Sequence, residues 1–330
     1  MTQKDYYRPI PSETGRWRLA GGWVRFSQCE LLRRGAAPEI VDEIPPDWLA
    51  RLTAPRPSVL GLSLEVPRLM AILNATPDSF SDGGLLGEGA QAVARGEALI
   101  AAGADLLDIG GESTRPGAAE VAVSDEIARV VPVIAGLAGA APISVDTRKA
   151  KVAASALKAG AGMVNDVSGF DFDPCMAKVV SHSGAALCLM HAQGLPETMQ
   201  DDPRYGDVLL DVYDALAERV ARALTAGVSA AKIVIDPGIG FGKTEAHNLA
   251  ILRRISLYHG LGLPVLLGIS RKRFIGQIGQ AEAAAARMPG TLALTLAAIG
   301  QGVQIHRVHD VAEIKQGLRL WSALDLGMSG

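Results

Sequence analysis

The sequence predicts a (β/α)8 barrel, because three features recur together along most of the chain. Apolar runs too short for a helix alternate with Ala-rich stretches of helical length, and each run ends in polar or charged residues. Eight such strand–helix units in about 260 residues match a barrel in number and length. A doubly wound open sheet is the competing architecture, and the lack of an edge-like strand among the eight runs favours closure.

The expected strands are continuous apolar runs, which is typical of parallel strands buried on both faces. They are residues 69–73, 106–109, 142–145, 163–165, 185–190, 233–235, 265–269 and 303–305. The clearest expected helices are residues 91–102, 125–137, 148–159, 207–226, 246–258 and 291–300. Several of these stretches end at or near a glycine, the residue most common just past a helix C-terminus.

Residues 1–65 differ from the repeating part, and we expect them to form a small N-terminal extension with a linker, ahead of a barrel domain at residues 66–330. Two β-like runs flank Gly21 and Gly22, which predicts a β-hairpin. Proline-rich pieces follow and are typical of a linker. No chemistry is assigned to this extension.

Composition excludes several classes of protein. Hydrophobic residues make up 48% and aromatic residues only 5%, so a large core of small and branched side chains is expected. A formal net charge of −3 argues against a nucleic-acid partner. No uncharged apolar run reaches the roughly 18 residues that span a bilayer, and the polar N-terminus does not have the apolar core of a signal peptide. We therefore expect a cytoplasmic protein with no membrane partner.

Hydrogen-bond acceptors stand at several expected strand ends, where the active site of such a barrel gathers. Asp146, Asn165 and Asp236 are the acceptors singled out. A buried carboxylate needs a donor or a cation, and a flat heterocycle with an amidine-like or guanidine-like edge offers it two parallel donors. Any one of these residues alone also fits a helix cap. Helix capping would not explain, however, why cationic side chains stand at the same strand ends.

Cationic side chains stand at the same strand ends. They are Arg115, Lys272, Arg307 and His309. Arginine fits phosphate oxygens with two parallel hydrogen bonds, while lysine acts as a point charge. Together with the acceptors they describe a ligand that has a donor-rich ring and an anionic, phosphorylated arm.

Asn74 ends the first expected strand and is the candidate ligand for Mg²⁺, with Asp78 and Asp82 in the loop that follows. Mg²⁺ is usually bound by few protein oxygens together with substrate phosphates. The sequence therefore predicts a magnesium site that is completed by a phosphorylated substrate.

Two other local patterns are weaker. Residues 237–244 differ from a phosphate-binding P-loop in having Pro237 where the first glycine is needed. His306 and His309 have a metal-like spacing but no Cys or Glu signature beside them, so a zinc site is not favoured.

Seven segments, taken in order, resemble the dihydropteroate synthase family of the folate pathway. The longest are ILNATPDSFSDGG at residues 72–84 and DIGGESTRPG at residues 108–117. The others are residues 144–147, 165–169, 236–243, 270–272 and 307–310. Each segment alone is a weak signal, but seven in the family's order across about 250 residues are specific.

The resemblance implies a barrel enzyme that joins 6-hydroxymethyl-7,8-dihydropterin diphosphate to 4-aminobenzoate and releases diphosphate and 7,8-dihydropteroate. It implies Mg²⁺ as cofactor, with Asn74 as ligand. It assigns the pterin to Asp146, Asn165, Asp236 and Lys272, the diphosphate to Thr114, Arg307 and His309, and the aminobenzoate side to Ser270 and Arg115. The expected catalytic residues are Arg307, His309 and Lys272.

Two further functions stay open at this point. A corrinoid-dependent pterin methyltransferase would share the barrel and the pterin-facing residues, but it would not need the cationic clamp. A non-catalytic pterin-binding paralogue would have lost loop or clamp residues, and none is visibly missing. The resemblance also implies a homodimer, for which the apolar helix expected at residues 291–300 is a plausible interface.

Overall fold

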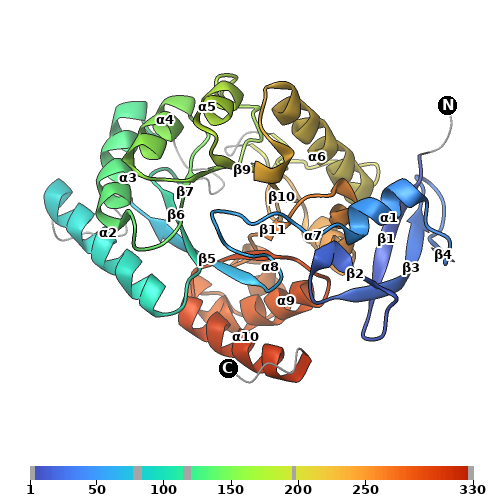
Figure 1. The fold of residues 1–330 in the computed structure, drawn as a ribbon. Coiled ribbons are helices and arrows are strands. Elements are labelled where there is room, and N and C mark those ends of the chain that lie inside the picture. The colour runs from blue at the N-terminus through green and yellow to red at the C-terminus, as the bar shows by residue number, and fades with distance from the viewer. Residues whose placement is uncertain (1–3, 77–83, 114–119, 195–197, 326–330) are drawn as a thin grey trace.

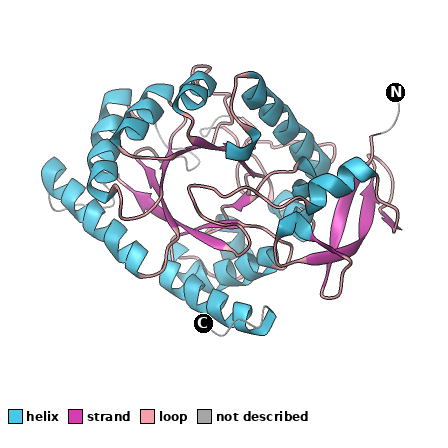
Figure 2. Ribbon diagram, viewed as in Figure 1, coloured by secondary structure: helices cyan, strands magenta, loops and turns pink. Residues whose placement is uncertain are grey.

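The computed structural model has eight parallel strands in one sheet that curves into a barrel, with helices outside it (Figures 1 and 2). It describes residues 4–76, 84–113, 120–194 and 198–325. The strands are β5 (Arg68–Asn74), β6 (Leu106–Gly110), β7 (Ile143–Asp146), β8 (Met163–Asp166), β9 (Ala186–Met190), β10 (Ile233–Asp236), β11 (Leu266–Leu267) and β12 (Ile305–Val308). The expected (β/α)8 barrel is confirmed.

The sheet runs in the order β10-β9-β8-β7-β6-β5-β12-β11 and closes between its two end strands. This last seam is short, because β11 has only two residues where a strand at 265–269 was expected. A single parallel bridge joins Ile235 to Val265 across it, and the Ile235 N–H donates to the Pro264 carbonyl at 3.0 Å. The barrel is therefore closed, with its weakest pairing beside the end of β10.

Helices cover the outside of the barrel in chain order (Figure 1). They are α2 (Gly84–Ala101), α3 (Val123–Leu137), α4 (Ala150–Ala159), α5 (Met176–Ser183), α6 (Val208–Thr225), α7 (Glu245–Arg253), α8 (Arg273–Ile278), α9 (Met288–Ile299) and α10 (Val311–Asp325). Each of the six helices singled out in the sequence is present.

Two of those helices differ most from the bounds expected. The stretch 246–258 is divided at Arg254 into α7 and a 3₁₀ segment η4 (Ile255–Leu261). The N-terminal extension contacts η4, where the Ser256 hydroxyl donates to the Pro9 carbonyl at 2.9 Å. Helix α2 begins at Gly84, before the expected residue 91.

The N-terminal extension forms a small antiparallel sheet. Its strands are β1 (Tyr6–Ser12), β2 (Trp17–Arg18), β3 (Arg25–Leu32) and β4 (Glu39–Val41), followed by helix α1 (Pro46–Thr53). Strands β2 and β3 pair antiparallel, so the expected hairpin is confirmed. The sheet packs on α6: the Tyr6 hydroxyl donates to Asp214 at 2.7 Å, and the Tyr6 ring lies edge-on to Tyr213.

The linker after α1 fills the N-terminal opening of the barrel. Val59 and Leu64 are 3% and 4% exposed. They belong to one apolar cluster with inward-facing residues from seven strands, namely Met70, Leu106, Met163, Ala186, Cys188, Val234, Leu266 and Ile305. In Figure 1 the blue trace between α1 and β5 crosses this opening. The linker therefore contributes to the barrel core, a role that the sequence did not indicate.

Among the residues that the structure describes, no helix has both the length and the apolar content needed to cross a membrane.

Leu64→Ala tests the contribution of the linker to the barrel core. We expect it to lower the free energy of unfolding by about 2–5 kcal/mol, because it leaves a cavity beneath the strands. Ile40→Ala, at a side chain that is 65% exposed, should change it by less than about 0.5 kcal/mol. Urea titration measures both, and equal effects would contradict a core role for Leu64.

Candidate active site

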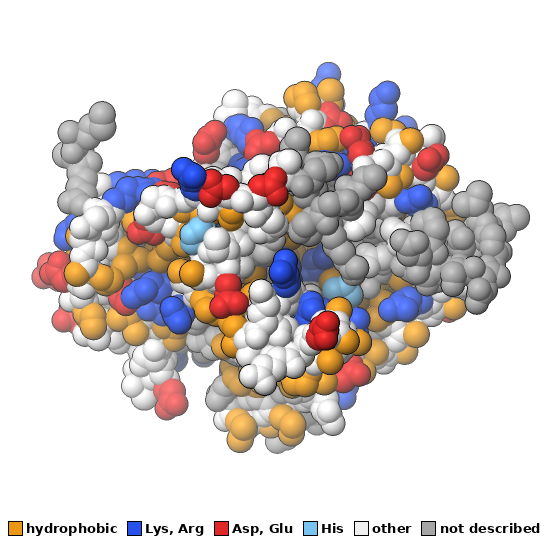
Figure 3. All heavy atoms as spheres, turned by 180° about the vertical axis from the view of Figure 1, so that it is seen from behind, with side chains coloured by type: hydrophobic (Ala, Val, Ile, Leu, Met, Phe, Trp, Pro, Cys, Tyr) orange, Lys and Arg blue, Asp and Glu red, His pale blue; other side chains and the backbone are white. Residues whose placement is uncertain are grey.

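The C-terminal ends of the strands form one rim, on the side opposite the linker. The parallel register pairs Gly110 with Asp146, and Asp146 with Asn165, so these strand ends lie level. Figure 3 shows the molecule from behind the view of Figure 1, and Lys, Arg and His side chains gather near the middle of that face. Parallel register thus brings polar residues distant in sequence to one surface.

Arg307, from β12, lies at the centre of the rim and holds two carboxylates. Its Nε is 2.6 Å from Asp108 Oδ2 and its Nη2 is 2.7 Å from Asp146 Oδ2. Asn165 adds a hydrogen bond of 3.0 Å from its amide nitrogen to the same Asp108 oxygen. Two acidic residues therefore share one guanidinium, and the group carries an excess negative charge.

The other oxygens of this group are ready to accept hydrogen bonds. Asp108 Oδ1 and Asp146 Oδ1 are buried and have no hydrogen-bond partner within the described chain. Burial raises the pKa of Asp146 to about 7, because the attraction of Arg307 does not fully offset burial and Asp108 adds repulsion. A ligand that donates to these oxygens would remove an existing penalty, since an unpaired buried acceptor is costly.

Asp236 and Lys272 form the second acid–base pair of the rim. Burial raises the pKa of Asp236, against the hydrogen bond from the Gly238 N–H at 2.7 Å and the attraction of Lys272. Burial lowers the pKa of Lys272 to about 7, and the attraction of Asp236 limits the fall. The Lys272 ammonium contacts the Ile239 carbonyl and lies 4.3 Å from the centre of the Phe241 ring.

The glycines of the loop after β10 allow these close approaches. Gly238 has φ +67°, and a Cβ there would lie 1.8 Å from the His191 carbonyl oxygen. Gly240 has φ +79°, and a Cβ there would lie 2.9 Å from the Lys272 side chain. Both positions therefore require glycine. The P-loop alternative is not supported, because Lys243 is buried and its ammonium bonds backbone carbonyls of the loop itself.

Lys243 is buried under this loop with His191. Its Nζ lies 2.8 Å from His191 Nδ1 and donates to the carbonyls of Gly238 and Phe241 at 2.9 and 3.1 Å. Burial lowers the pKa of Lys243 well below its usual range, and burial with the Lys243 charge lowers that of His191 to about 2. The pair holds the backbone beside Asp236 in place.

Ser270 and His309 meet at the ends of β11 and β12. The Ser270 hydroxyl oxygen lies 2.9 Å from His309 Nδ1 and accepts the His309 backbone N–H at 3.1 Å. Between Ser270 and Lys272, Arg271 adopts φ +59° and is held there by an ion pair with Asp310. This turn directs Lys272 toward the β10 loop while Ser270 stays beside His309.

Asn74 lies at the end of β5, in register with Gly110. It can offer one amide oxygen at the rim, which fits the few protein ligands that Mg²⁺ takes beside substrate phosphates. The described residues contain no cluster of three or more His, Cys, Asp or Glu that could hold a metal ion. Asp78, Asp82, Thr114 and Arg115 lie outside the described residues.

The structure thus brings Asn74, Asp146, Asn165, Asp236, Ser270, Lys272, Arg307 and His309 to strand ends on one side of the barrel. Three other residues of the rim, Asp108, His191 and Lys243, stand at the expected strand ends but were not assigned to the candidate site. The signal for Asp108 was a charged residue inside the apolar run LLDIG, where burial demands a partner. Nothing in the local sequence indicates that Lys243 points inward.

Comparison with known proteins identifies the family. The profile of the family described as pterin binding enzyme matches residues 70–309. Dihydropteroate synthase of Escherichia coli is 44% identical over 268 residues, which cover 80% of this chain and 93% of that protein. The Bacillus subtilis dihydropteroate synthase is 44% identical over 271 residues, covering 82% and 92%.

Solved structures agree with this assignment. A Xanthomonas albilineans dihydropteroate synthase with 4-aminobenzoic acid superimposes with a TM-score of 0.75 at 45% identity, covering 80% of this chain and 94% of that one. The same organism's enzyme in complex with 7,8-dihydropteroate gives 0.74 at 42% identity, covering 82% and 98%. The chain belongs to the dihydropteroate synthase family of pterin-binding enzymes.

Proposed function

We propose that the protein condenses 6-hydroxymethyl-7,8-dihydropterin diphosphate with 4-aminobenzoate, giving 7,8-dihydropteroate and diphosphate. One observation carries the proposal: Arg307 and Lys272 share one barrel rim with the buried acceptors Asp108, Asp146 and Asp236. A molecule with a donor-rich ring at one end and an anionic arm at the other matches this arrangement. The relatives with bound 4-aminobenzoic acid and 7,8-dihydropteroate support the same reaction.

The acidic group would bind the pterin ring. The unpaired oxygens of Asp108 and Asp146 accept the ring's N–H donors, while Asn165 fixes the Asp108 carboxylate. Asp236 and Lys272 would bind the same pterin ring from the neighbouring side of the rim. Because these groups are buried and already held, little reorganisation accompanies binding.

The chemistry asks for stabilisation of charge rather than for a nucleophile on the protein. The C–O bond between the pterin methylene and diphosphate breaks, and its electrons leave with the diphosphate. The arylamine nitrogen then forms the new C–N bond and loses a proton to solvent. Buried carboxylates stabilise the positive charge that develops on the ring, while Arg307 and His309 stabilise the departing anion.

Mg²⁺ is proposed as cofactor, with Asn74 as a ligand. When bound, it would neutralise charge on the leaving diphosphate. Thr114 is proposed for the diphosphate, and Arg115 and Ser270 for the aminobenzoate side.

Asp236→Asn tests the pterin site. We expect diphosphate release from the pterin substrate and 4-aminobenzoate, in the presence of Mg²⁺, to fall at least about 100-fold, because a charged acceptor is lost next to the developing cation. The control is Asp125→Asn on the exposed start of α3, which should keep wild-type rates. Normal turnover by D236N would contradict the assignment, and an inactive wild type would contradict the function or favour one of the two alternatives.

The pKa of Asp146 predicts a pH dependence. Below about pH 7 the carboxyl takes up a proton and loses its charge, so binding of a pterin ring should weaken as the pH falls through that value. Titration calorimetry with 6-hydroxymethylpterin between about pH 5 and pH 8 measures this change. Asp146→Asn should bind weakly at every pH, and an unchanged slope in that variant would assign the titration to another group.

The homodimer is proposed on the apolar outer surface of the last helices. Helix α9 buries Thr291 and Thr295 against the barrel, while Leu294 and Leu296 are only partly buried. Helix α10 packs beside it and exposes Leu320 and Leu324 at 65% and 85%. An exposed apolar surface of this kind is typical of a protein–protein interface. The cytoplasmic location stays a prediction.

Charge on that surface should separate the subunits. The double variant Leu320→Lys, Leu324→Lys is expected to elute as a monomer when light scattering measures its mass, because burying two ammonium groups is unfavourable. Leu224→Lys on α6, at a side chain that is 45% exposed, is the matched control and should leave the mass unchanged. A wild-type protein of monomer mass would contradict the proposal.

A further inference from the structure

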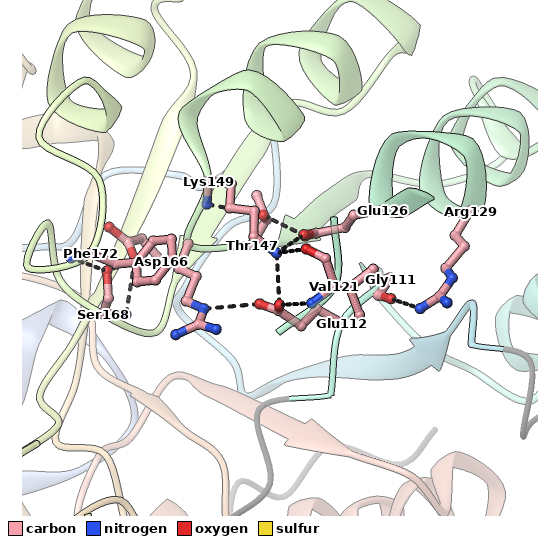
Figure 4. A network of polar contacts seen from close by, with 11 residues as sticks. Gly111, Glu112, Val121, Glu126, Arg129, Thr147, Lys149, Asp166, Ser168 and Phe172 are labelled. Carbon is pink, nitrogen blue, oxygen red and sulfur yellow. Dashed lines mark hydrogen bonds and ion pairs between the residues drawn. The ribbon is translucent and has the colours of Figure 1, made fainter. Parts of the chain in front are cut away.

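Lys243 differs from Lys149, the other buried lysine of the described chain, in the groups that it contacts. Lys149 is 3% exposed and pairs with two carboxylates, those of Glu112 and Glu126, each at 2.7 Å (Figure 4). Lys243 is also 3% exposed, but the contacts of its amino group are with His191 and with backbone carbonyls. Pairing with a buried carboxylate therefore explains Lys149 and does not explain Lys243.

The contacts of Lys243 join the end of β9 to the loop that follows β10. Its Nζ lies 2.8 Å from His191 Nδ1 and 3.3 Å from the His191 carbonyl oxygen. The same amino group donates to the carbonyls of Gly238 and Phe241, at 2.9 and 3.1 Å. Buried carbonyls need donors, and an apolar side chain at this position would supply none. One side chain therefore fixes the loop at two points that are three residues apart.

The part of the loop between these two points holds Lys272. The Lys272 ammonium contacts the Ile239 carbonyl and lies 4.3 Å from the centre of the Phe241 ring. At the start of the loop, the Gly238 N–H donates to Asp236 Oδ1 at 2.7 Å. Lys272 and Asp236 are thus both bonded to a stretch of backbone whose carbonyls the buried amino group holds.

The protonation of Lys243 suits a position next to a rim of carboxylates. Burial lowers its pKa well below the usual range, although the attraction of Asp236 raises it. Without its third proton the amino group still has two N–H groups, one for each loop carbonyl, and a lone pair that can accept the Nδ1–H of His191. The loop is then held without a full positive charge beside Asp236, so the excess negative charge of the rim is kept.

We propose that Lys243 is a positioning residue for the reaction: by holding the carbonyls of Gly238 and Phe241, it fixes the place of the Lys272 ammonium beside Asp236. The proposal rests on the function proposed above, in which Lys272 and Asp236 bind the pterin ring. Groups that are in place before the substrate arrives need not reorganise during the reaction, and small displacements of such groups are costly.

Lys243→Met is the test, because methionine is unbranched and flexible but has no N–H to donate. Hydrogen exchange, read by mass spectrometry, should become faster for the backbone amides of residues 238–241, since the loop carbonyls lose their donor. The kcat/KM for the pterin diphosphate should fall roughly tenfold or more, because the Lys272 ammonium is no longer held at the rim.

A double variant shows whether Lys243 acts through Lys272. Lys272→Met should lower kcat/KM by itself. Adding Lys243→Met to it should change kcat/KM by less than about twofold, because the group that Lys243 positions is already gone. A merely structural role predicts instead that the two losses multiply. If turnover of Lys272→Met falls below detection, the affinity for 6-hydroxymethylpterin, measured by titration calorimetry, replaces kcat/KM in the same comparison.

Tyr205→Phe is the matched control. The Tyr205 hydroxyl donates to the Gly242 carbonyl at 2.7 Å, so this variant also removes a hydrogen bond to the loop. Gly242 lies beyond the stretch that contacts Lys272. Both the exchange of residues 238–241 and kcat/KM should therefore stay within about twofold of wild type.

Wild-type kcat/KM in Lys243→Met, multiplying losses in the double variant, or equal losses in Lys243→Met and Tyr205→Phe would overturn the proposal. If Lys243→Met does not fold, Lys243→Gln replaces it, because its amide is polar but its shorter side chain cannot reach both carbonyls together. A wild-type protein that releases no diphosphate would reject the proposed function, while hydrogen exchange and pterin affinity would still decide whether Lys243 acts through the loop.

Discussion

The arrangement of the rim depends on one guanidinium that serves two buried carboxylates. Arg307 reaches Asp108 and Asp146 from β12, which β5 separates from β6 in the sheet, so β6, β7 and β12 must hold their ends level for both ion pairs to form. The two ion pairs leave one oxygen of each carboxylate without a hydrogen-bond partner. They also leave the group of Asp108, Asp146 and Arg307 with one more acidic than basic side chain. A ring that is rich in donors and positively charged would satisfy the unpaired oxygens and balance the negative charge. Positive charge of this kind develops on a pterin as diphosphate departs. The same electrostatic imbalance therefore favours binding and reaction.

Around this centre the protein uses backbone geometry more than reactive side chains. Gly238 and Gly240 let the β10 loop pass close to His191 and Lys272, and the left-handed turn at Arg271 separates Lys272 from Ser270. Lys243 and Lys149 each lie inside the protein and bond backbone carbonyls. Two lysines in the interior thus hold two different rim loops, which suits a reaction that needs charges in place and no covalent intermediate.

The sequence predicts the barrel and most of the rim, because parallel strands are apolar throughout and stop where polar residues begin. Asn165, Asp236 and Arg307 were identifiable because each ends or interrupts such a run. The contacts within the rim could not be predicted. Strand register and loop closure decide that Arg307 pairs with Asp108 and that Lys243 points inward. The linker was underestimated for a similar reason, since short apolar pieces such as Val59 and Leu64 carry no periodicity, and their burial is decided only by the opening they fill.

The plug at the N-terminal opening has a consequence for biosynthesis. Val59 and Leu64 leave the ribosome before any barrel strand, yet their neighbours include Leu266 and Ile305, near the end of the chain. This apolar segment therefore cannot complete its burial until the last strands are translated. Until then the exposed apolar side chains favour aggregation of the nascent chain, and a polypeptide truncated before β12 could not complete this cluster.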